Sequence, residues 1–341
     1  MWQRRLKLTV LTVTCVVSFA MATVIWMWND RPSVEDIAWP APPAPGDNRG
    51  TVIVTWLGVT TLLFDDGETQ ILIDGFFSRP TLSDILLRRP VDNDAPMINF
   101  AMNEYRMRHL AAIIPVHSHF DHAMDIGEIA NRSSASVLGS ESTANIARGA
   151  GVPEDQIVLA EPGQAYTFGE FEVTLLPSRH APIGWRGAPP LPGTIDEPLV
   201  MPQPVGAMRE GGSYAVLIRH PQGTAIVQGS AGFNIGPLEG VSADVVLLGI
   251  GGIGTLDIAF AEQFWHALVT STGAKSVYPI HFDDFTKPFG EVVPWPGFLG
   301  DLGEIADWME TFRDRWDEDT ALYLPRFGVP IALYEQSSSR T

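Results

Sequence analysis

The sequence predicts an α/β fold in which two β-sheets pack together and helices cover them on the outside. Short apolar or alternating segments recur between residues 51 and 73, and glycine or Asp-Gly turns separate them, which is typical of antiparallel strands. Further along the chain, strand-like segments alternate with stretches of helical periodicity. With 341 residues, 45% of them hydrophobic, the chain is long enough to bury a large core in one domain.

The first 28 residues predict a membrane segment, either a signal anchor or a signal peptide. Three basic residues among the first seven precede the uncharged span from Leu8 to Trp28. A helix of this length crosses a bilayer, and basic residues before it place the domain on the periplasmic or extracellular face. The alternative is secretion after cleavage near Ala22, where small residues form a cleavage site. The apolar stretch continues past that site, which favours the uncleaved anchor.

Residues 29–50 predict a proline-rich linker between the membrane segment and a domain that spans residues 51–341. Four prolines lie between residues 40 and 45. Such a segment is extended and semi-rigid, so we expect it to hold the domain off the membrane.

The composition limits the classes of molecule that the protein is expected to bind. The formal net charge is −18, and an acidic surface repels nucleic acid. We therefore expect a small-molecule or lipid substrate, no nucleic acid, and membrane contact through residues 8–28. The only cysteine, Cys15, lies inside the apolar span, so disulfides cannot be part of the fold.

The remaining elements follow from periodicity and turn residues. The expected strands are 51–57, 60–64, 70–73, 110–116, 166–168, 171–176, 213–219, 224–227, 245–248 and 276–280. The expected helices are 123–131, 142–148, 257–270 and 302–313.

Four potential metal ligands stand within six residues, directly after the apolar strand 110–116. They are His117, His119, Asp121 and His122. Residues two apart in an extended chain face the same side, so His117 and His119 point together, and the next two ligands turn to a second position. Imidazole and carboxylate suit zinc, and also iron and manganese. The spacing therefore predicts a divalent metal centre with one or two ions, zinc being the first choice.

The motif His117-Ser118-His119-Phe120-Asp121-His122 resembles the HxHxDH signature of the metallo-β-lactamase superfamily, and the likeness extends over about residues 51–335. The resemblance implies a four-layer αββα sandwich, an early strand that ends in a buried Asp at Asp74, and two further histidine ligands. His180 would join His117 and His119 around one ion, and His281 would join Asp121 and His122 around the other. The branch that looks most similar holds ascorbate-6-phosphate lactonase-like proteins and N-acyl phosphatidylethanolamine phospholipase D.

One position departs from the pattern of that superfamily. The Asp that usually bridges the two metals is expected after the strand 224–227, where this chain has Ser230. A hydroxyl is a weaker ligand than a carboxylate, so Ser230 is at most a weak metal contact, and the second ion should bind less tightly. Hydroxide, Asp283 or Asp284 are the alternative sources of the missing negative charge.

The predicted function is a metal-dependent hydrolase that uses a metal-bound hydroxide to cleave an ester, lactone or phosphodiester bond. Asp121 is the candidate catalytic residue, because it can steer the nucleophile or carry a proton. The alternative is a catalytically inactive, membrane-tethered metal-binding or interaction protein of the same fold, for which the absent bridging Asp would be the sign.

Two long irregular segments, 76–108 and 181–212, follow Asp74 and His180 closely in the sequence. Such segments beside a metal centre often form lids or substrate walls. We expect Trp185 and Arg186 to contact the substrate, because they follow His180 closely and an Arg pairs with phosphate or carboxylate. The glycine-rich run 249–255 lacks the lysine of a phosphate-binding loop, and we expect a close-packed turn at the edge of the site.

Overall fold

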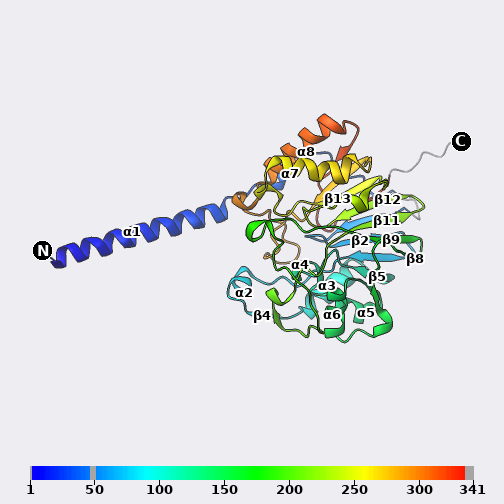
Figure 1. Cartoon of the computed structure of the whole chain (residues 1–341), viewed down its shortest axis with the longest axis horizontal. Coiled ribbons are helices and arrows are strands. Elements are labelled where there is room, and N and C mark those ends of the chain that lie inside the picture. Colours follow the sequence, from blue (N-terminus) through cyan, green and yellow to red (C-terminus); the bar gives the residue numbers. More distant parts are fainter. Residues whose placement is uncertain (1, 47–50, 335–341) are drawn as a thin grey trace.

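The computed structural model describes residues 2–46 and 51–334 of the chain. Two seven-stranded sheets lie face to face, with helices on the outer side of each, and this confirms the predicted four-layer αββα sandwich (Figure 1). The expected linker residues 47–50 and the last residues of the domain, 335–341, lie outside the described residues.

The first sheet has the strand order β16-β1-β2-β3-β5-β6-β7. Its strands are β16 (Pro330–Ala332), β1 (Ile53–Trp56), β2 (Leu62–Asp65), β3 (Gln70–Ile73), β5 (Leu110–Ile114), β6 (Ser136–Gly139) and β7 (Ile157–Leu159). Pairing is antiparallel from β16 to β3 and parallel from β3 to β7. Parallel pairing places the carboxyl ends of β3 and β5 at the same edge, so Asp74 and His117 leave the sheet side by side.

The second sheet has the order β15-β14-β13-β12-β11-β9-β8. Its strands are β15 (Ala321–Leu322), β14 (Ser276–Ile280), β13 (Val245–Gly249), β12 (Gly223–Gln228), β11 (Tyr214–His220), β9 (Phe171–Pro177) and β8 (Ala165–Phe168). It repeats the arrangement of the first sheet, with antiparallel pairing from β8 to β12 and parallel pairing from β12 to β15.

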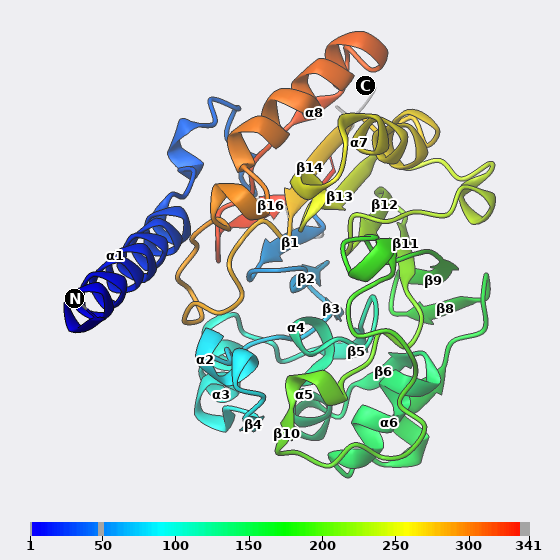
Figure 2. The ribbon, with the colours of Figure 1, turned by 60° about the vertical axis from the view of Figure 1, so that its left-hand side comes forward.

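Helices cover the two outer faces (Figures 1 and 2). On the first sheet they are α3 (Ala95–Glu104), α4 (Phe120–Ala123), α5 (Ile126–Ser133) and α6 (Glu141–Gly149), and on the second α7 (Ile258–Trp265) and α8 (Leu302–Trp316). A π-helical turn (His266–Thr270) extends α7. Shorter 3-10 turns are Val34–Asp36, Glu154–Gln156, Trp185–Gly187, Val205–Ala207, Gly236–Leu238, Ile253–Thr255 and Gly297–Leu299.

The core has two main parts because side chains alternate between the faces of a strand. On β5, Ala112 and Ile114 face the second sheet and join the large inter-sheet cluster, whereas Ile113 packs under the helices. The strand is therefore apolar on both faces, as the continuous run at 110–116 predicts.

The two long insertions are joined to each other rather than being independent surface loops. The first carries α2 (Leu82–Leu86), β4 (Pro90–Val91) and α3, and the second carries β10 (Gln203–Pro204). β4 and β10 pair antiparallel in a separate two-stranded sheet. The insertions therefore form one covering layer beside the ends of β3 and β5.

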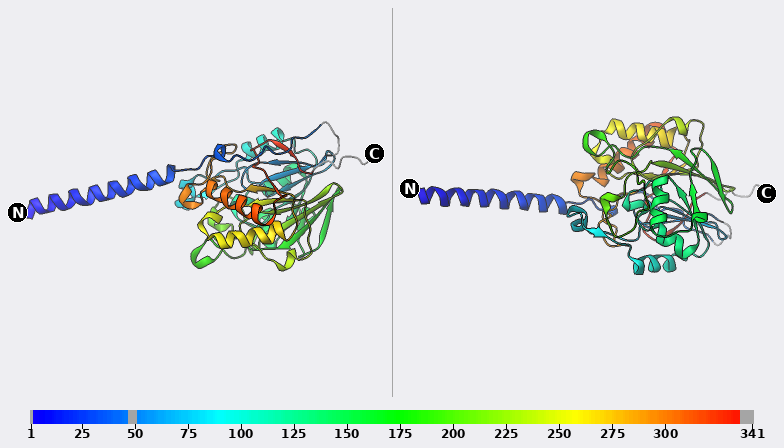
Figure 3. Two further views of the ribbon diagram at one scale, coloured as in Figure 1. Left: turned by 90° about the horizontal axis from the view of Figure 1, so that it is seen from above. Right: turned by 60° about the horizontal axis from the view of Figure 1, so that its bottom comes forward.

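The N-terminal helix α1 (Trp2–Asn29) projects away from the domain (Figures 1 and 3). Within it, Arg5–Asn29 is long and apolar enough to cross a membrane, and none of the most apolar 18-residue window is buried against the protein. By length and composition alone, such a helix is either a membrane anchor or a signal sequence.

The proline-rich segment differs from the free spacer that its composition predicts. Its described part, residues 30–46, packs along the domain instead of standing clear of it. Val34, Ile37 and Trp39 rest against the inter-sheet core, and the Trp39 indole donates a hydrogen bond to Glu310 (2.6 Å). The described part of the segment is therefore not a free spacer, because the apolar side chains between the prolines are held at the edge of the core.

Candidate metal centre

The predicted ligands gather where β5 runs into α4. β5 ends at Ile114 and α4 begins at Phe120, so Asp121 and His122 lie in the first helical turn. The expected helix 123–131 is divided into α4 and α5, and α4 begins before residue 123. His119 is the N-cap residue of α4, and its side chain makes no capping bond, which leaves the imidazole free to point elsewhere.

His117, His119 and His180 form the first ligand group. One ligand atom from each lies within 4.8 Å of the others. Nε2 of His117 and Nδ1 of His119 are 3.0 Å apart, near the spacing of about 3.3 Å expected for two nitrogens on one tetrahedral zinc. Nδ1 of His180 lies 3.0 Å from the Ala181 carbonyl, which leaves Nε2 for a metal.

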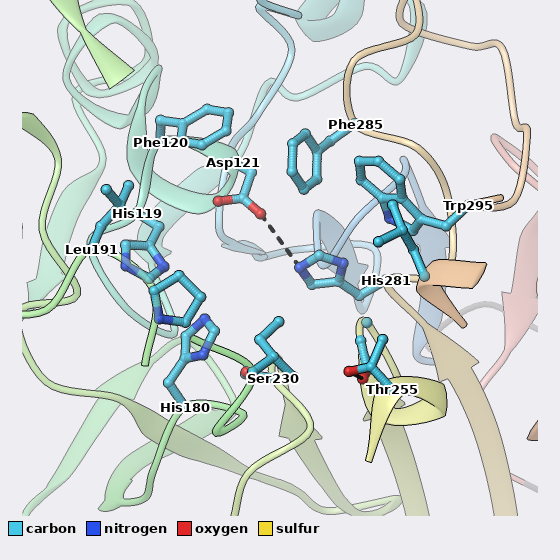
Figure 4. Close-up of a pocket in the computed structure, with 15 residues that line it drawn as sticks. His119, Phe120, Asp121, His180, Leu191, Ser230, Thr255, His281, Phe285 and Trp295 are labelled. Carbon is cyan, nitrogen blue, oxygen red and sulfur yellow. Dashed lines mark hydrogen bonds and ion pairs between the residues drawn. The ribbon is translucent and has the colours of Figure 1, made fainter. Parts of the chain in front are cut away.

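Asp121, His122 and His281 form the second ligand group, which satisfies the same 4.8 Å limit. Oδ2 of Asp121 lies 3.5 Å from Nε2 of His122 and 3.4 Å from Nε2 of His281. Figure 4 shows the Asp121 carboxylate between His119 and His281, where the two groups meet. The sequence prediction of two separate positions is thus reproduced in the geometry.

Asp74 supports the second group from beneath. This fully buried carboxylate follows β3 and lies 2.6 Å from Nδ1 of His122, and its other oxygen accepts the Val116 backbone N–H at 2.8 Å. A carboxylate on one imidazole nitrogen fixes the tautomer in which the other nitrogen has a free lone pair. Asp74 therefore turns Nε2 of His122 into a ligand.

Burial and mutual repulsion keep the first group neutral. Burial is the main cause that lowers the pKa of His117 well below its usual value, followed by the neighbouring imidazoles. Burial, and then His119, lower the pKa of His180 to about 3. Burial also lowers the pKa of His119, against the pull of Asp121. Neutral imidazoles are the form that binds metal.

In the second ligand group, interactions between opposite charges outweigh the effect of burial on the pKa values. Burial alone would lower the pKa of His122, but the carboxylates of Asp74 and Asp121 outweigh it and raise that pKa. Burial alone would raise the pKa of Asp121, but His122 and His281 hold it below the usual range. The site therefore keeps one carboxylate ionised among five imidazoles.

An independent structural observation indicates that this set of donor atoms fits a divalent metal. Among the described residues, Nε2 of His122 is buried without a hydrogen-bond partner although the opposite nitrogen of the ring is bonded to Asp74. A buried polar atom without a partner is costly unless something binds it. A cation between the ligand groups would satisfy this lone pair.

Ser230 lies in the wall of the same site but is already engaged. It follows β12, and its hydroxyl accepts the Ala181 backbone N–H at 2.9 Å. This bond ties the serine to the segment that carries His180.

The alternative sources of negative charge, Asp283 and Asp284, are directed elsewhere. Asp283 accepts the Val59 N–H at 2.8 Å and lies 3.8 Å from Arg79, and Asp284 pairs with Arg31 at 2.9 Å. Neither belongs to a ligand group among the described residues. The expectation that one of them supplies the missing ligand is wrong, because both carboxylates are used to hold the surrounding loops.

A cavity of about 370 Å³ opens above the two groups (Figure 4). His119, Asp121, His180, Ser230 and His281 line its floor. Its walls are mostly apolar and come from four segments: Phe120, Ile183, Pro190, Leu191, Phe285, Trp295 and Leu299, with Gly251, Gly252 and Thr255. The insertion 181–212 and the glycine-rich run thus both border the site.

Trp185 and Arg186 do not line this cavity. Trp185 is 84% exposed, and the guanidinium of Arg186 lies 5.8 Å from its ring. The structure therefore does not place these two residues in the cavity wall, and their contact with a substrate stays a prediction. The chain turns back after Ile183, so the cavity wall is made by Ile183 and by Pro190 and Leu191 instead.

Sequence reasoning missed the aromatic wall. Phe285 and Trp295 lie beyond the last ligand, and their rings pack edge to face 4.8 Å apart. Neither has a spacing relation to the histidines, and the only available signal was their position shortly after His281.

No family model matches the chain. It is 25% identical over 235 residues to a UPF0173 metal-dependent hydrolase of Heliobacterium modesticaldum, which covers 68% of this chain and 83% of that protein. It is 26% identical over 261 residues to another of that name from Myxococcus xanthus, with 71% and 78% covered. Among solved structures, the metallo-beta-lactamase fold protein YhfI from Bacillus subtilis superposes with a TM-score of 0.50 at 14% identity, over 82% of this chain and 98% of that one.

The layered fold, the two ligand groups after β5, β9 and β14, and these relatives agree with one another. The chain has the metallo-β-lactamase fold and is similar in sequence to UPF0173 metal-dependent hydrolases.

Proposed function

We propose that this chain is a metal-dependent hydrolase that cleaves an ester, lactone or phosphodiester bond. The observation that carries the proposal is the position of the two ligand groups on the floor of a cavity that is open to a substrate. Metal sites whose ligands are closed on all sides are structural, whereas catalytic sites keep an accessible position.

The roles of the residues follow from their positions. His117, His119 and His180 would hold one ion, and Asp121, His122 and His281 a second. A bound divalent ion lowers the pKa of its water to about 7 and polarises the oxygen of the bond under attack. Asp121 lies where the groups meet, so its carboxylate can orient the attacking water and take up its proton. Zinc suits the donor set best, with iron or manganese as the alternatives.

The cavity favours an uncharged ester or lactone over a phosphodiester. Its wall residues are apolar or neutral, and neither Lys nor Arg is among the residues that line it. An anionic substrate would rely on the metal alone for its compensating charge. We therefore expect the scissile bond to carry an aromatic or aliphatic group that fills the space against Phe285, Trp295 and Leu191.

The proposal is tested with the full-length protein, zinc-loaded and chelator-treated, on a panel of chromogenic esters, lactones and phosphodiesters. We expect chelator-sensitive turnover that His119→Ala abolishes. His109→Ala is the matched control, because His109 is exposed and outside both ligand groups, and it should retain activity. Stoichiometric metal with no turnover on any substrate would instead support the inactive metal-binding alternative.

A further inference from the structure

The end of α1 is attached to the segment that forms one wall of the cavity. The backbone carbonyl of Asp30 accepts the Gly297 N–H at 3.0 Å, and the Arg31 guanidinium donates to the Pro294 carbonyl at 2.7 Å. The rings of Trp28 and Phe298 lie 6.2 Å apart. Trp295 and Leu299 of the same segment line the cavity. The last turn of α1 and the cavity wall are therefore one packed unit.

Several large apolar side chains are exposed near this unit. Phe298 is 48% exposed, and Ile183, which lines the cavity, is 40% exposed. Trp185 is 84% exposed. Isolated apolar residues on a surface are ordinary, but each of these lies on a segment that also supplies a cavity-lining residue, Ile183 or Leu299.

Helix α2 continues this surface. Leu86 and Leu87 at its end are 71% and 62% exposed. The preceding Ile85 packs into a small cluster with Phe120 and Phe285, and both of these line the cavity. In Figures 1 and 3, α2 and the orange segment that includes residues 294–300 lie at the end of the domain turned toward α1.

Basic residues stand next to the exposed apolar ones. Arg88 and Arg89 follow Leu87, and Arg186 follows Trp185, and all three are exposed. The chain as a whole carries a net charge of −18, so a group of exposed arginines beside apolar residues differs from the acidic average of the protein. Apolar side chains interleaved with arginine are typical of surfaces that enter the headgroup region of an anionic membrane.

We propose that this α1-proximal face, defined by Leu86, Leu87, Ile183, Trp185 and Phe298, docks on the phospholipid bilayer that α1 spans. The cavity then opens toward the membrane, and its apolar substrates enter from the lipid phase. The exposed side chains and their arginines reach about 5–10 Å into the interface. The docking is independent of the proposed hydrolysis, because it is a property of the surface.

The test uses the full chain in nanodiscs of phosphatidylcholine and phosphatidylglycerol. Cys15→Ser removes the only native thiol, and a bimane probe is attached to Leu87→Cys or Trp185→Cys. Trp316→Cys is the matched control, because Trp316 is also 48% exposed but stands at the far end of the 15-residue helix α8. Quenching is measured with aqueous iodide and with lipids that carry a nitroxide on the acyl chain.

We expect the probes at positions 87 and 185 to be quenched several-fold more by the nitroxide lipid, and several-fold less by iodide, than the probe at 316. Equal iodide quenching at all three positions overturns the proposal. Protection from iodide without quenching by the lipid also overturns it, because a protein partner or a second copy would then cover the face. No outcome depends on activity, so failure of the docking is distinguishable from failure of the hydrolase proposal.

Discussion

Replacing Asp74 by Asn tests how the second ligand group is built. The carboxylate is fully buried, lies 2.6 Å from Nδ1 of His122 and accepts the Val116 N–H through its other oxygen. In Asp74→Asn the single amide oxygen keeps the bond to Val116, so the amide N–H₂ faces His122. The imidazole then accepts at Nδ1 and carries its proton on Nε2, which removes the lone pair that a metal needs.

Removing an orienting carboxylate of this kind weakens metal binding by about 10- to 100-fold, or about 1.4–2.8 kcal/mol. We expect a loss of zinc affinity in this range for Asp74→Asn. Elemental analysis in chelator-buffered zinc measures the occupancy of both groups. We expect the ion at Asp121, His122 and His281 to weaken, and the ion at His117, His119 and His180 to keep its affinity.

Asp66→Asn is the matched control for this substitution. Asp66 is also a buried carboxylate that accepts backbone N–H groups, at 2.9 and 2.7 Å in the turn between β2 and β3, and it lies 3.6 Å from His220. It should lower stability without changing metal affinity. Wild-type affinity for both ions in Asp74→Asn would refute the role assigned to Asp74.

Three further outcomes are expected. Ser230→Asp should tighten the second ion in the same zinc titration, because it adds a carboxylate at the floor of the cavity, and an unchanged affinity would show that residue 230 does not face the metals. Asp125→Asn should destabilise the domain by about 1–3 kcal/mol in urea unfolding, since the buried carboxylate accepts N–H bonds from Phe77 and Ser78 and an amide would leave a donor facing donors. Zinc at about 100 times its dissociation constant should add about 2.7 kcal/mol of stability that chelator removes, and a melting temperature that does not respond to zinc would contradict a native metal site.

The sequence predicted the parts of the site that share a strand or a turn. His117, His119, Asp121 and His122 follow one apolar strand, and local geometry alone decides which side each faces. β3 runs from Gln70 to Ile73, as its apolar residues and the preceding turn predicted. His180 and His281 needed the resemblance, because a single histidine after a strand carries no spacing of its own.

The missed parts depend on contacts between distant segments. Asp283 and Asp284 looked like ligands because they follow His281, but Val59 and Arg31 decide where they point. The strand β16 pairs with β1, although almost the whole domain lies between them in the sequence. The three residues of β16 give no periodic signal. The segment 30–46 shows the same limit, since proline content predicts its extended form but not the surface on which it lies.

The backbone around the second ligand group is held in an unfavourable conformation at linked positions. Val59 (φ 50°), Asp74 (φ 57°) and His281 (φ 61°) all occupy the left-handed region, which costs about 1–3 kcal/mol for each residue other than glycine. For the β-branched Val59 this is a genuine outlier. Asp and His adopt positive φ more often than most residues other than glycine, but a single Asp or His in a sequence does not indicate it, and Val59 gives no sign of it at all.

Buried hydrogen bonds offset this strain and connect these residues to the ligands. The Val59 carbonyl accepts the His281 N–H at 2.9 Å, and the Val59 N–H donates to Asp283 at 2.8 Å. Gly251 lies so close behind the His281 ring that a Cβ there would be 2.8 Å from Nδ1, which leaves Nε2 directed at Asp121. The backbone bond to Val59 and the close contact with Gly251 favour the ligand orientation of His281, so a metal binds with a smaller loss of conformational entropy than a mobile ligand would impose.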